Sequence, residues 1–370
     1  MKQQGFTLIE LMVGVALGLL ATVVIAQVFV QSQSGQRTTG SGADAQVAGA
    51  MALFTVQRDV QAAGYGLTDW PAALGCPVKA VAGSGAVLNG SSDVLVPVQI
   101  AFGANAQTSD RVTVMASGST EHSVPSKVVE AHGSSSTHFL VSSHLGLQAN
   151  DLMLAVPADW AAASKTCRVF QATDVSAATR IVHGEGGTWN TQAFDSELPA
   201  GSVLLNLGAK PVRRQYEVDT ATWTLQVQDL LTTAGASSTP RGMYPNIVLL
   251  KALYGKSNGT SDAVSSYSAT QPTTPAQWRE VRAIRLVLVA RSAQFERDVD
   301  GVPVTPDAPQ WPVGDLAADL PGLAPCRGNE DVQCLPLDVS ASGPDNEWQR
   351  YRYKVFDTVI PLRNLVWSPA

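Results

Sequence analysis

The chain has 370 residues, of which 45% are hydrophobic and 15% are charged, and its formal net charge is −6 at pH 7. This composition is typical of a folded protein with enough apolar material for a sizeable core, and it excludes extended disorder. Nucleic-acid-binding proteins usually carry a cationic surplus that neutralises phosphates. Because this chain has no such surplus, we expect no nucleic-acid partner.

The first long apolar segment lies close to the N-terminus. The twenty residues from Leu11 to Val30 carry no charge. A helix rises about 1.5 Å per residue, so a helix of this length crosses the ~30 Å hydrocarbon core of a bilayer. The alternative is a cleaved secretory signal, but its apolar region has about 7–15 residues behind a positively charged start, and here Lys2 alone supplies that charge. We predict one membrane-spanning helix over residues 6–30.

Glu10 places a carboxylate at the start of this apolar helix. A charged side chain costs about 2.5–3.5 kcal/mol at the centre of a spanning helix and less near its end, so Glu10 either has a functional partner or reaches the lipid headgroups. Every fourth residue after Glu10 is small, namely Gly14, Gly18, Thr22 and Ala26. Small residues at this spacing let neighbouring helices approach closely in a membrane. The pattern therefore predicts a helix that packs against other helices.

Residues 2–10, KQQGFTLIE, resemble the leader and mature start of type IV pilins and of type II secretion pseudopilins. The resemblance implies that a prepilin peptidase cuts after Gly5 and that the new N-terminus, Phe6, is methylated. It also implies a partner for Glu10, the amine of Phe6 on a neighbouring subunit of a filament. Two such charges about 4 Å apart attract by about 4 kcal/mol at an effective dielectric of 20, before desolvation is subtracted.

The remaining chain divides into a second helical stretch and a β-rich body. We expect an amphipathic helix over 31–64 with a soft joint near residues 35–42, where glycines weaken the helix and Ser41-Gly-Ala-Asp44 has the form of a capping box. From residue 65 to 370 short apolar β-type runs alternate with loops rich in Gly, Ser, Asn and Pro. This order predicts an α+β fold in which one long N-terminal helix packs on a mostly antiparallel sheet. The runs are 94–96, 112–114, 139–141, 152–156, 203–205 and 281–290, with a hairpin at 216–227 and long insertions at 255–277 and 298–345.

Four cysteines, Cys76, Cys167, Cys326 and Cys334, include no C-x-x-C pair. In an oxidising compartment four cysteines allow three pairings, which the sequence does not decide. The short Pro/Gly-containing loop from Cys326 to Cys334 makes that pair the favoured one, which leaves Cys76 with Cys167. Without a histidine at ligand spacing, a zinc site is a poor alternative.

Motifs for chemistry are incomplete. Gly255-Lys256-Ser257 lacks the upstream glycine of a phosphate-binding loop, and neither an H-E-x-x-H nor a G-x-S-x-G motif occurs. The acidic residues Glu296, Asp298, Asp300 and Asp307 form either a solvated turn or an irregular calcium site. We therefore expect no enzyme activity, no cofactor and no dedicated metal site.

Two further segments resemble the PilW type of minor pilin: Phe54 to Gly66, FTVQRDVQAAGYG, and Tyr351 to Asn364, which contains PLRN. This resemblance implies a single-pass inner-membrane protein with a periplasmic head that becomes part of a type IV pilus, near its tip, and primes assembly. It implies as partners other minor pilins, the major pilin, the prepilin peptidase/methyltransferase and the inner-membrane assembly platform. The alternatives are a J-type pseudopilin of type II secretion, which is similar in its first fifty residues, and a membrane-tethered adhesin or binding protein.

Overall fold

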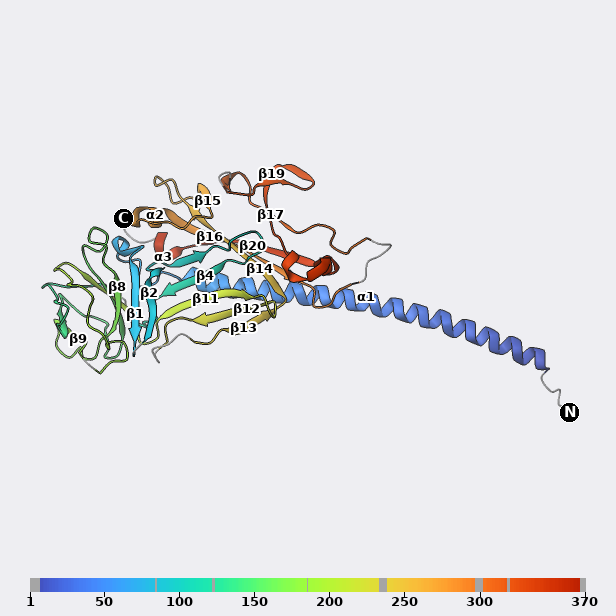
Figure 1. Cartoon of the computed structure of the whole chain (residues 1–370), viewed down its shortest axis with the longest axis horizontal. Coiled ribbons are helices and arrows are strands. Elements are labelled where there is room, and N and C mark those ends of the chain that lie inside the picture. The colour runs from blue at the N-terminus through green and yellow to red at the C-terminus, as the bar shows by residue number, and fades with distance from the viewer. Residues whose placement is uncertain are drawn as a thin grey trace.

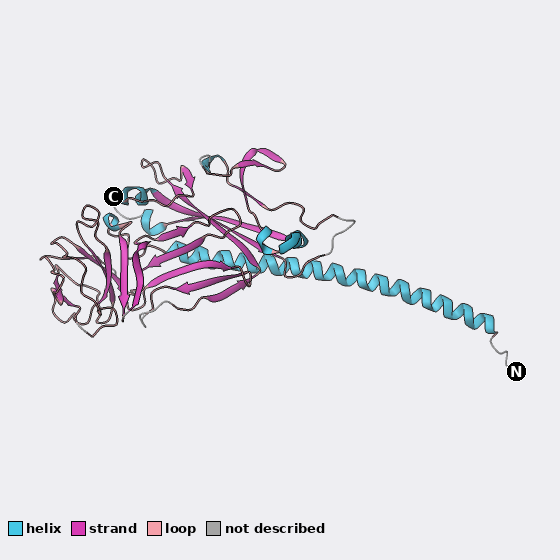
Figure 2. Cartoon of the chain, viewed as in Figure 1, coloured by secondary structure: helices cyan, strands magenta, loops and turns pink. Residues whose placement is uncertain are grey.

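One long helix carries the chain into a β-rich head (Figure 1). The structure, a computed structural model, describes residues 7–83, 85–121, 124–184, 186–232, 238–296, 302–317 and 320–366, without the side chains of 30, 31, 33–41, 317, 344 and 366. Helix α1 spans Leu8–Ala62. Its first half projects from the head, and its second half runs into it (Figure 2). The predicted α+β fold, one long helix on mostly antiparallel sheets, is confirmed.

Helix α1 is continuous through residues 35–42. The capping box expected at Ser41 therefore does not begin a second helical piece, and this part of the prediction is wrong. An interior glycine costs a helix about 1 kcal/mol relative to alanine, whereas proline costs about 3. With no proline before Pro71, the glycines weaken the helix without ending it. Whether this stretch is mechanically compliant stays a prediction.

One face of the second half of α1 packs against strands of two antiparallel sheets. One sheet has the strand order β13-β12-β11-β4-β3 and the other the order β15-β14-β16-β20. Buried residues of α1 share one core cluster with strands of both sheets. The strands of the first sheet are β3 (Val98–Ala101), β4 (Arg111–Ala116), β11 (Val212–Asp219), β12 (Thr224–Asp229) and β13 (Arg241–Pro245); those of the second are β14 (Ile247–Lys256), β15 (Ser266–Ser268), β16 (Val281–Arg291) and β20 (Tyr353–Pro361).

A second β region lies at the end of the head that is remote from the projecting helix (Figure 1). Its main sheet has the order β2-β1-β8-β7-β10-β5, in which β1 and β8 run parallel, and β6 and β9 form a separate pair. This region has its own apolar clusters, and we call it the distal region. Its strands are β1 (Pro77–Ala82), β2 (Gly85–Val94), β5 (Ser126–Lys127), β6 (His138–Leu140), β7 (Leu152–Val156), β8 (Cys167–Gln171), β9 (Arg180–Val182) and β10 (Val203–Gly208).

Most apolar runs singled out in the sequence are strands. The expected hairpin is the pair β11–β12, in which Tyr216 lies opposite Val227 and Val218 opposite Leu225. Trp223 belongs to its turn and has a positive φ of 51°. The strand predicted at 94–96 is confirmed only at Val94, because β2 ends at that residue. The remaining elements are α2 (Pro275–Glu280), α3 (Arg363–Val366), β17 (Gln310–Pro312), β18 (Ala324–Cys326), β19 (Asn329–Pro336) and four short 3₁₀ turns, η1 (Pro71–Ala73), η2 (Asp315–Ala317), η3 (Ser340–Ser342) and η4 (Pro344–Arg350).

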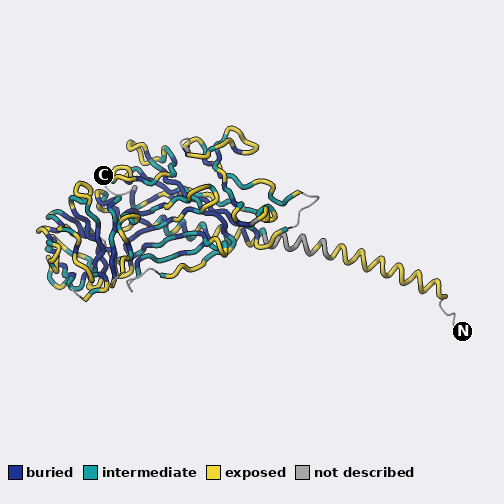
Figure 3. Tube along the Cα trace, in the orientation of Figure 1, coloured by how far each residue is buried: buried dark blue, intermediate teal, exposed yellow. Residues whose placement is uncertain are grey.

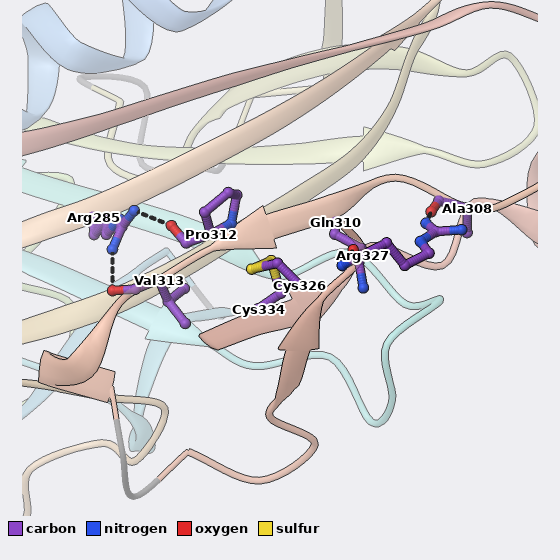
Figure 4. Close-up of a disulfide and its surroundings, with 8 residues drawn as sticks. All are labelled: Arg285, Ala308, Gln310, Pro312, Val313, Cys326, Arg327 and Cys334. Carbon is purple, nitrogen blue, oxygen red and sulfur yellow. Dashed lines mark hydrogen bonds between the residues drawn. A yellow bond between two sulfur atoms is a disulfide. The ribbon is translucent and has the colours of Figure 1, made fainter. Parts of the chain in front are cut away.

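All four cysteines form disulfides, in the favoured pairing. Cys76 bonds to Cys167 with an S–S distance of 2.02 Å and joins the start of β1 to β8, while Cys326 bonds to Cys334 at 2.05 Å. The second bond closes the small sheet β17-β19-β18 within the expected insertion 298–345 (Figure 4). Arg285 of β16 holds this sheet against the head by donating to the carbonyl oxygens of Pro312 and Val313 (Figure 4).

Candidate assembly helix and its attachment to the head

The projecting half of α1 is apolar and unburied. Leu8–Phe29, 22 residues with a mean hydropathy of 2.5, are long and apolar enough to cross a membrane, and none of the residues in this stretch is buried. Figure 3 shows this stretch as exposed along its whole length. Large apolar side chains fully in water are unfavourable by about 1.5–3 kcal/mol each. This half of the helix therefore requires a lipid or protein environment that its own chain does not supply.

Glu10 lies in the first turn of α1 and caps it. Thr7 is the N-cap residue: its hydroxyl oxygen accepts from the backbone N–H of Glu10 at 3.3 Å. In return, Oε2 of Glu10 accepts from the backbone N–H and the hydroxyl of Thr7, at 3.2 and 3.1 Å. This is a capping box, and a carboxylate is also favoured by the positive end of the helix dipole. A carboxylate has lone pairs on two oxygens, so the cap leaves Glu10 able to bind a cation as well.

Sequence reasoning missed this cap, although T-x-x-E is its usual signal. The expected partner of Glu10 was the N-terminus of another subunit, whereas the partner that the structure shows is Thr7 of the same chain. Gly5 and Phe6, the expected cleavage and methylation positions, lie outside the described residues. The pairing of Glu10 with a neighbouring Phe6 therefore stays a prediction.

The small residues that follow Glu10 form a ridge on the exposed helix. Gly14, Gly18, Thr22 and Ala26 are all exposed, and a Cβ added at Gly14 or Gly18 would meet nothing within 4 Å. Positions four apart advance by about 40° per step, so this row is inclined to the helix axis by about 26°. It is not a straight stripe but one of the ridges through which helices commonly pack. Thr22 satisfies its hydroxyl within the helix by donating to the carbonyl oxygen of Leu19 at 2.8 Å.

The second half of α1 is buried on one side. Ala52, Val56 and Val60 are fully buried, with 0% exposure. At Gly49 the helix approaches β20 so closely that an added Cβ would overlap the ring of Phe356. The opposite side, with Val47, Met51 and Phe54, is exposed.

Asp59 is the polar anchor of this buried side. The phenol of Tyr216 donates to its Oδ2 at 2.6 Å, and Arg214 donates to the same oxygen at 3.0 Å. Burial, followed by the hydrogen bond to Asp59, raises the pKa of Tyr216, so the phenol stays a donor at neutral pH. The side chain of Asp59 is 9% exposed, whereas that of its neighbour Arg58 is 68% exposed.

Two family models match the chain. The "Prokaryotic N-terminal methylation motif" matches residues 1–26, and "Type IV Pilus-assembly protein W", PilW, matches residues 215–364. Residues 215–364 are thus similar to PilW proteins, and the N-terminus carries the methylation motif. No curated protein matches the chain. Among solved structures it is similar to a type IV-like pilin from Thermus thermophilus, with 11% identity, a TM-score of 0.30, and coverage of 85% of this chain and 94% of that one.

The PilW match begins at the docking contact and ends at the far end of α1. Tyr216, its second residue, binds Asp59. Asn364, its last residue, donates through Nδ2 to the carbonyl oxygens of Ala62 and Ala63, at 3.2 and 2.9 Å. The last carbonyls of a helix have no partner within it. The C-terminal PLRN segment, which the sequence analysis gives only as a resemblance, therefore caps the C-terminal end of helix α1.

The exit from α1 explains the Ala63-Gly64-Tyr65 segment. Gly64 has φ +86° and donates its N–H to the carbonyl oxygen of Met115 in β4 at 2.8 Å. A side chain at this φ would be strained, and its Cβ would also lie 3.0 Å from Thr68. Helix α1 is thus fixed to the head along its side and at its end.

Groups suited to metal chemistry are dispersed. Among the described ranges, no cluster of three or more His, Cys, Asp or Glu side chains is placed to hold a metal ion. Asp298 and Asp300, two members of the possible calcium site, lie outside those ranges, and Glu296 is engaged by Arg352 at 2.6 Å. His132 and His183 meet instead as a buried pair with their Nε2 atoms 2.8 Å apart.

Proposed function

We propose that this protein is a PilW-type minor subunit of a type IV pilus that primes filament assembly at or near the tip. The observation that carries the proposal is the unburied Leu8–Phe29 helix, with Glu10 and a ridge of small residues, fixed to a large head. An apolar helix of this kind is stable in lipid or among similar helices. A head that extends far beyond the helix is harder to repeat along a filament than to place once at its end.

The proposed mechanism has three steps. The leader is removed after Gly5, and Phe6 becomes the methylated N-terminus. The helix then holds the subunit in the inner membrane with the head in the periplasm. Finally the helix moves into the filament core, where Glu10 meets the Phe6 amine of a neighbouring pilin and the small residues permit close packing. The partners are other minor pilins, the major pilin, the peptidase/methyltransferase and the assembly platform, and the role is structural rather than enzymatic.

The experiment that tests priming separates the number of pili from their length. Cells that lack this chain should have at least tenfold fewer pili, and the remaining filaments should have normal length. In sheared filaments, the amount of this protein should follow the number of filaments and not the mass of major pilin. A protein content that rises with filament length would contradict priming and would indicate a subunit spaced along the shaft.

The competing interpretations make different predictions. The PilW match favours a pilus over a secretion pseudopilus. A tethered adhesin would use the helix for attachment alone, so replacing Leu8–Phe29 by an unrelated apolar span should preserve its function. For a pilus subunit, the same exchange should abolish piliation while membrane insertion is retained.

A further inference from the structure

Strand β20 lies at the edge of the sheet β15-β14-β16-β20 and has nine residues. It pairs with β16 along its whole length without a register shift. The other edge strands that the structure describes have two to five residues, apart from β2, whose pairing with β1 is interrupted by register shifts. Proteins commonly keep edge strands short, irregular or covered, because an open edge pairs with other chains. Among the described strands, β20 is therefore the edge best suited to accept a further strand.

The hydrogen bonds at the two ends of β20 show which of its backbone groups point away from β16. Ser292 donates its N–H to the carbonyl oxygen of Arg352 at 2.8 Å, and Leu362 donates its N–H to that of Arg282 at 2.9 Å. In an antiparallel pair, residues with such bonds alternate with residues whose N–H and C=O groups face outward. The even-numbered residues of β20 therefore bond to β16. The outward-facing residues are Tyr353, Val355, Asp357 and Val359.

The described parts of the chain leave this edge open. Just before β20, the carbonyl oxygen of Tyr351 also points away from β16, and it accepts from the hydroxyl of Thr305 at 2.6 Å. Among the described residues, no hydrogen bond of this kind continues onto the outward groups of β20. The burial of the side chains agrees, because Ile360 is the one buried residue of β20, whereas all of β16 is buried except three arginines. Val359 is 45% exposed.

The spacing of the outward groups fits an extended polypeptide. They occur at every second residue, and at about 3.4 Å per residue the donors and acceptors recur about every 7 Å. Another strand supplies N–H and C=O groups with the same repeat, whereas a small ligand would cover only part of so long an edge. Strand addition is a common mode of peptide recognition, in which main-chain hydrogen bonds provide affinity and alternate side chains provide specificity.

A second copy of the same chain is a poor occupant of this edge. Phe356 of β20 lies beside Gly49, and Asn364, shortly after β20, binds the carbonyl oxygens of Ala62 and Ala63. Strand β20 thus runs in the same direction as α1. Antiparallel pairing of two β20 strands would point the two α1 helices in opposite directions. Their apolar halves could then not enter one membrane from the same side, so a different protein fits the edge better.

We propose that the edge of β20 from Tyr353 to Val359 is a docking site for an extended segment of a second protein. The segment adds antiparallel to β20, which is slightly more stable per residue than parallel pairing. Val355 and Val359 lie on one face of the strand, so the segment carries apolar residues opposite both. Between them, the carboxylate of Asp357 is held by Arg285 at 2.7 Å, so an uncharged hydroxyl residue fits opposite it. This interaction goes beyond the proposed assembly role and does not depend on it.

A synthetic peptide tests the docking site directly. The heptapeptide VTTVVET, acetylated and amidated, places valines opposite Val359 and Val355 and a threonine opposite Asp357 when it adds antiparallel. It should bind the full chain in lipid nanodiscs, as measured by calorimetry, and slow the hydrogen exchange of β20.

Two methylated peptides are the matched controls. N-methylation of the third and fifth residues, whose N–H groups face β20, should weaken binding at least tenfold, because it removes hydrogen bonds and prevents close approach. The same change at the second and fourth residues, whose N–H groups face away, should weaken binding by less than about twofold. Equal binding of the two methylated peptides, or no binding of the parent peptide at millimolar concentrations, would overturn the proposal.

Two proline variants separate docking from folding. The N–H of Val359 faces the free edge, so Val359→Pro should keep the head folded in a urea titration and weaken binding of the parent peptide at least tenfold. Thr358→Pro removes an N–H that faces Leu286 of β16 and should lower the urea midpoint. Val359→Thr keeps the outward N–H and should bind within about twofold of the natural chain. Unchanged binding by Val359→Pro would refute the edge. Dimers of the full chain that disappear with Val359→Pro would overturn the assignment to a second protein.

Discussion

The two halves of helix α1 differ in what buries them. Ala52, Val56 and Val60 in the second half are fully enclosed by the sheets of the head, whereas the first half, Leu8–Phe29, has no buried residue. Yet the first half is the more continuously apolar. An α-helix with apolar residues on one face is satisfied by one protein surface, while a helix apolar on all faces needs lipid or several neighbours. The head therefore holds the helix at one end and leaves the apolar surface of the other end uncovered.

The comparison predicts that changes in the first half affect assembly and changes in the second half affect folding. The same kind of substitution can be made in each half, at an acidic residue or at a glycine. The two variants of a pair then differ only in their position along the helix. A variant in the first half that destabilises the head, or a variant in the second half that lowers piliation without destabilising the head, would contradict this prediction.

The largest effect is expected for substitutions of Glu10, which should lower the number of pili. Glu10→Ala removes both the cap on Thr7 and the charge, while Glu10→Gln keeps an acceptor for the cap and removes the charge alone. If the charge pairs with a neighbouring N-terminus, both variants should insert into the membrane normally and reduce pili at least tenfold, since a pair of this kind contributes about 4 kcal/mol before desolvation. Electron microscopy counts the pili and membrane fractionation checks insertion. Normal piliation by Glu10→Gln would show that Glu10 acts only as a cap.

The next effect is expected at Asp59, in the docked half. Asp59→Ala leaves the buried phenol of Tyr216 without its acceptor and Arg214 without one of its two carboxylates. Breaking a buried pair costs about 3–5 kcal/mol, and because the Arg214 side chain is 38% exposed we expect about 2–3 kcal/mol less stability toward urea. Arg58→Ala is the matched control. Its side chain is 68% exposed, so its loss should cost under about 0.5 kcal/mol. Equal losses for both variants would contradict the anchor.

The sequence predicted the membrane-length helix, the antiparallel head and the favoured cysteine pairing because these depend on short-range signals. The uncharged apolar stretch, the alternating apolar residues of the strands and the short loop from Cys326 to Cys334 are each contained in one short segment of the sequence. The anchor at Asp59 could not be predicted, since Tyr216 is 157 residues away in the chain. The same holds for Asn364 and the end of α1, at separations of 301 and 302 residues.

Glycine 49 sharpens the comparison within the docked half. Gly49→Ala gains about 1 kcal/mol of helix propensity, but its methyl group would overlap the ring of Phe356 in β20. Overpacking typically costs about 1–3 kcal/mol, so we expect a net loss of about 1 kcal/mol in a urea titration. The double variant Gly49→Ala with Phe356→Leu makes room for the methyl and should recover part of this loss relative to Phe356→Leu alone. Stabilisation by Gly49→Ala alone would show that the helix can move away from β20.

Glycine 18 is the counterpart in the projecting half, and its effect on folding should be the smallest. A Cβ at Gly18 meets no atom of its own chain within 4 Å. Gly18→Ala should therefore leave the urea stability of the head unchanged within about 0.5 kcal/mol. If the ridge contacts neighbouring helices, the added methyl should still lower piliation, and Gly18→Leu should lower it further, because close helix approach in membranes depends on small residues. Thr22→Ala, which keeps the ridge small, is the control and should assemble normally. A normal pilus count for Gly18→Leu would mean that the ridge faces lipid and that other residues of the helix make the contacts in the filament.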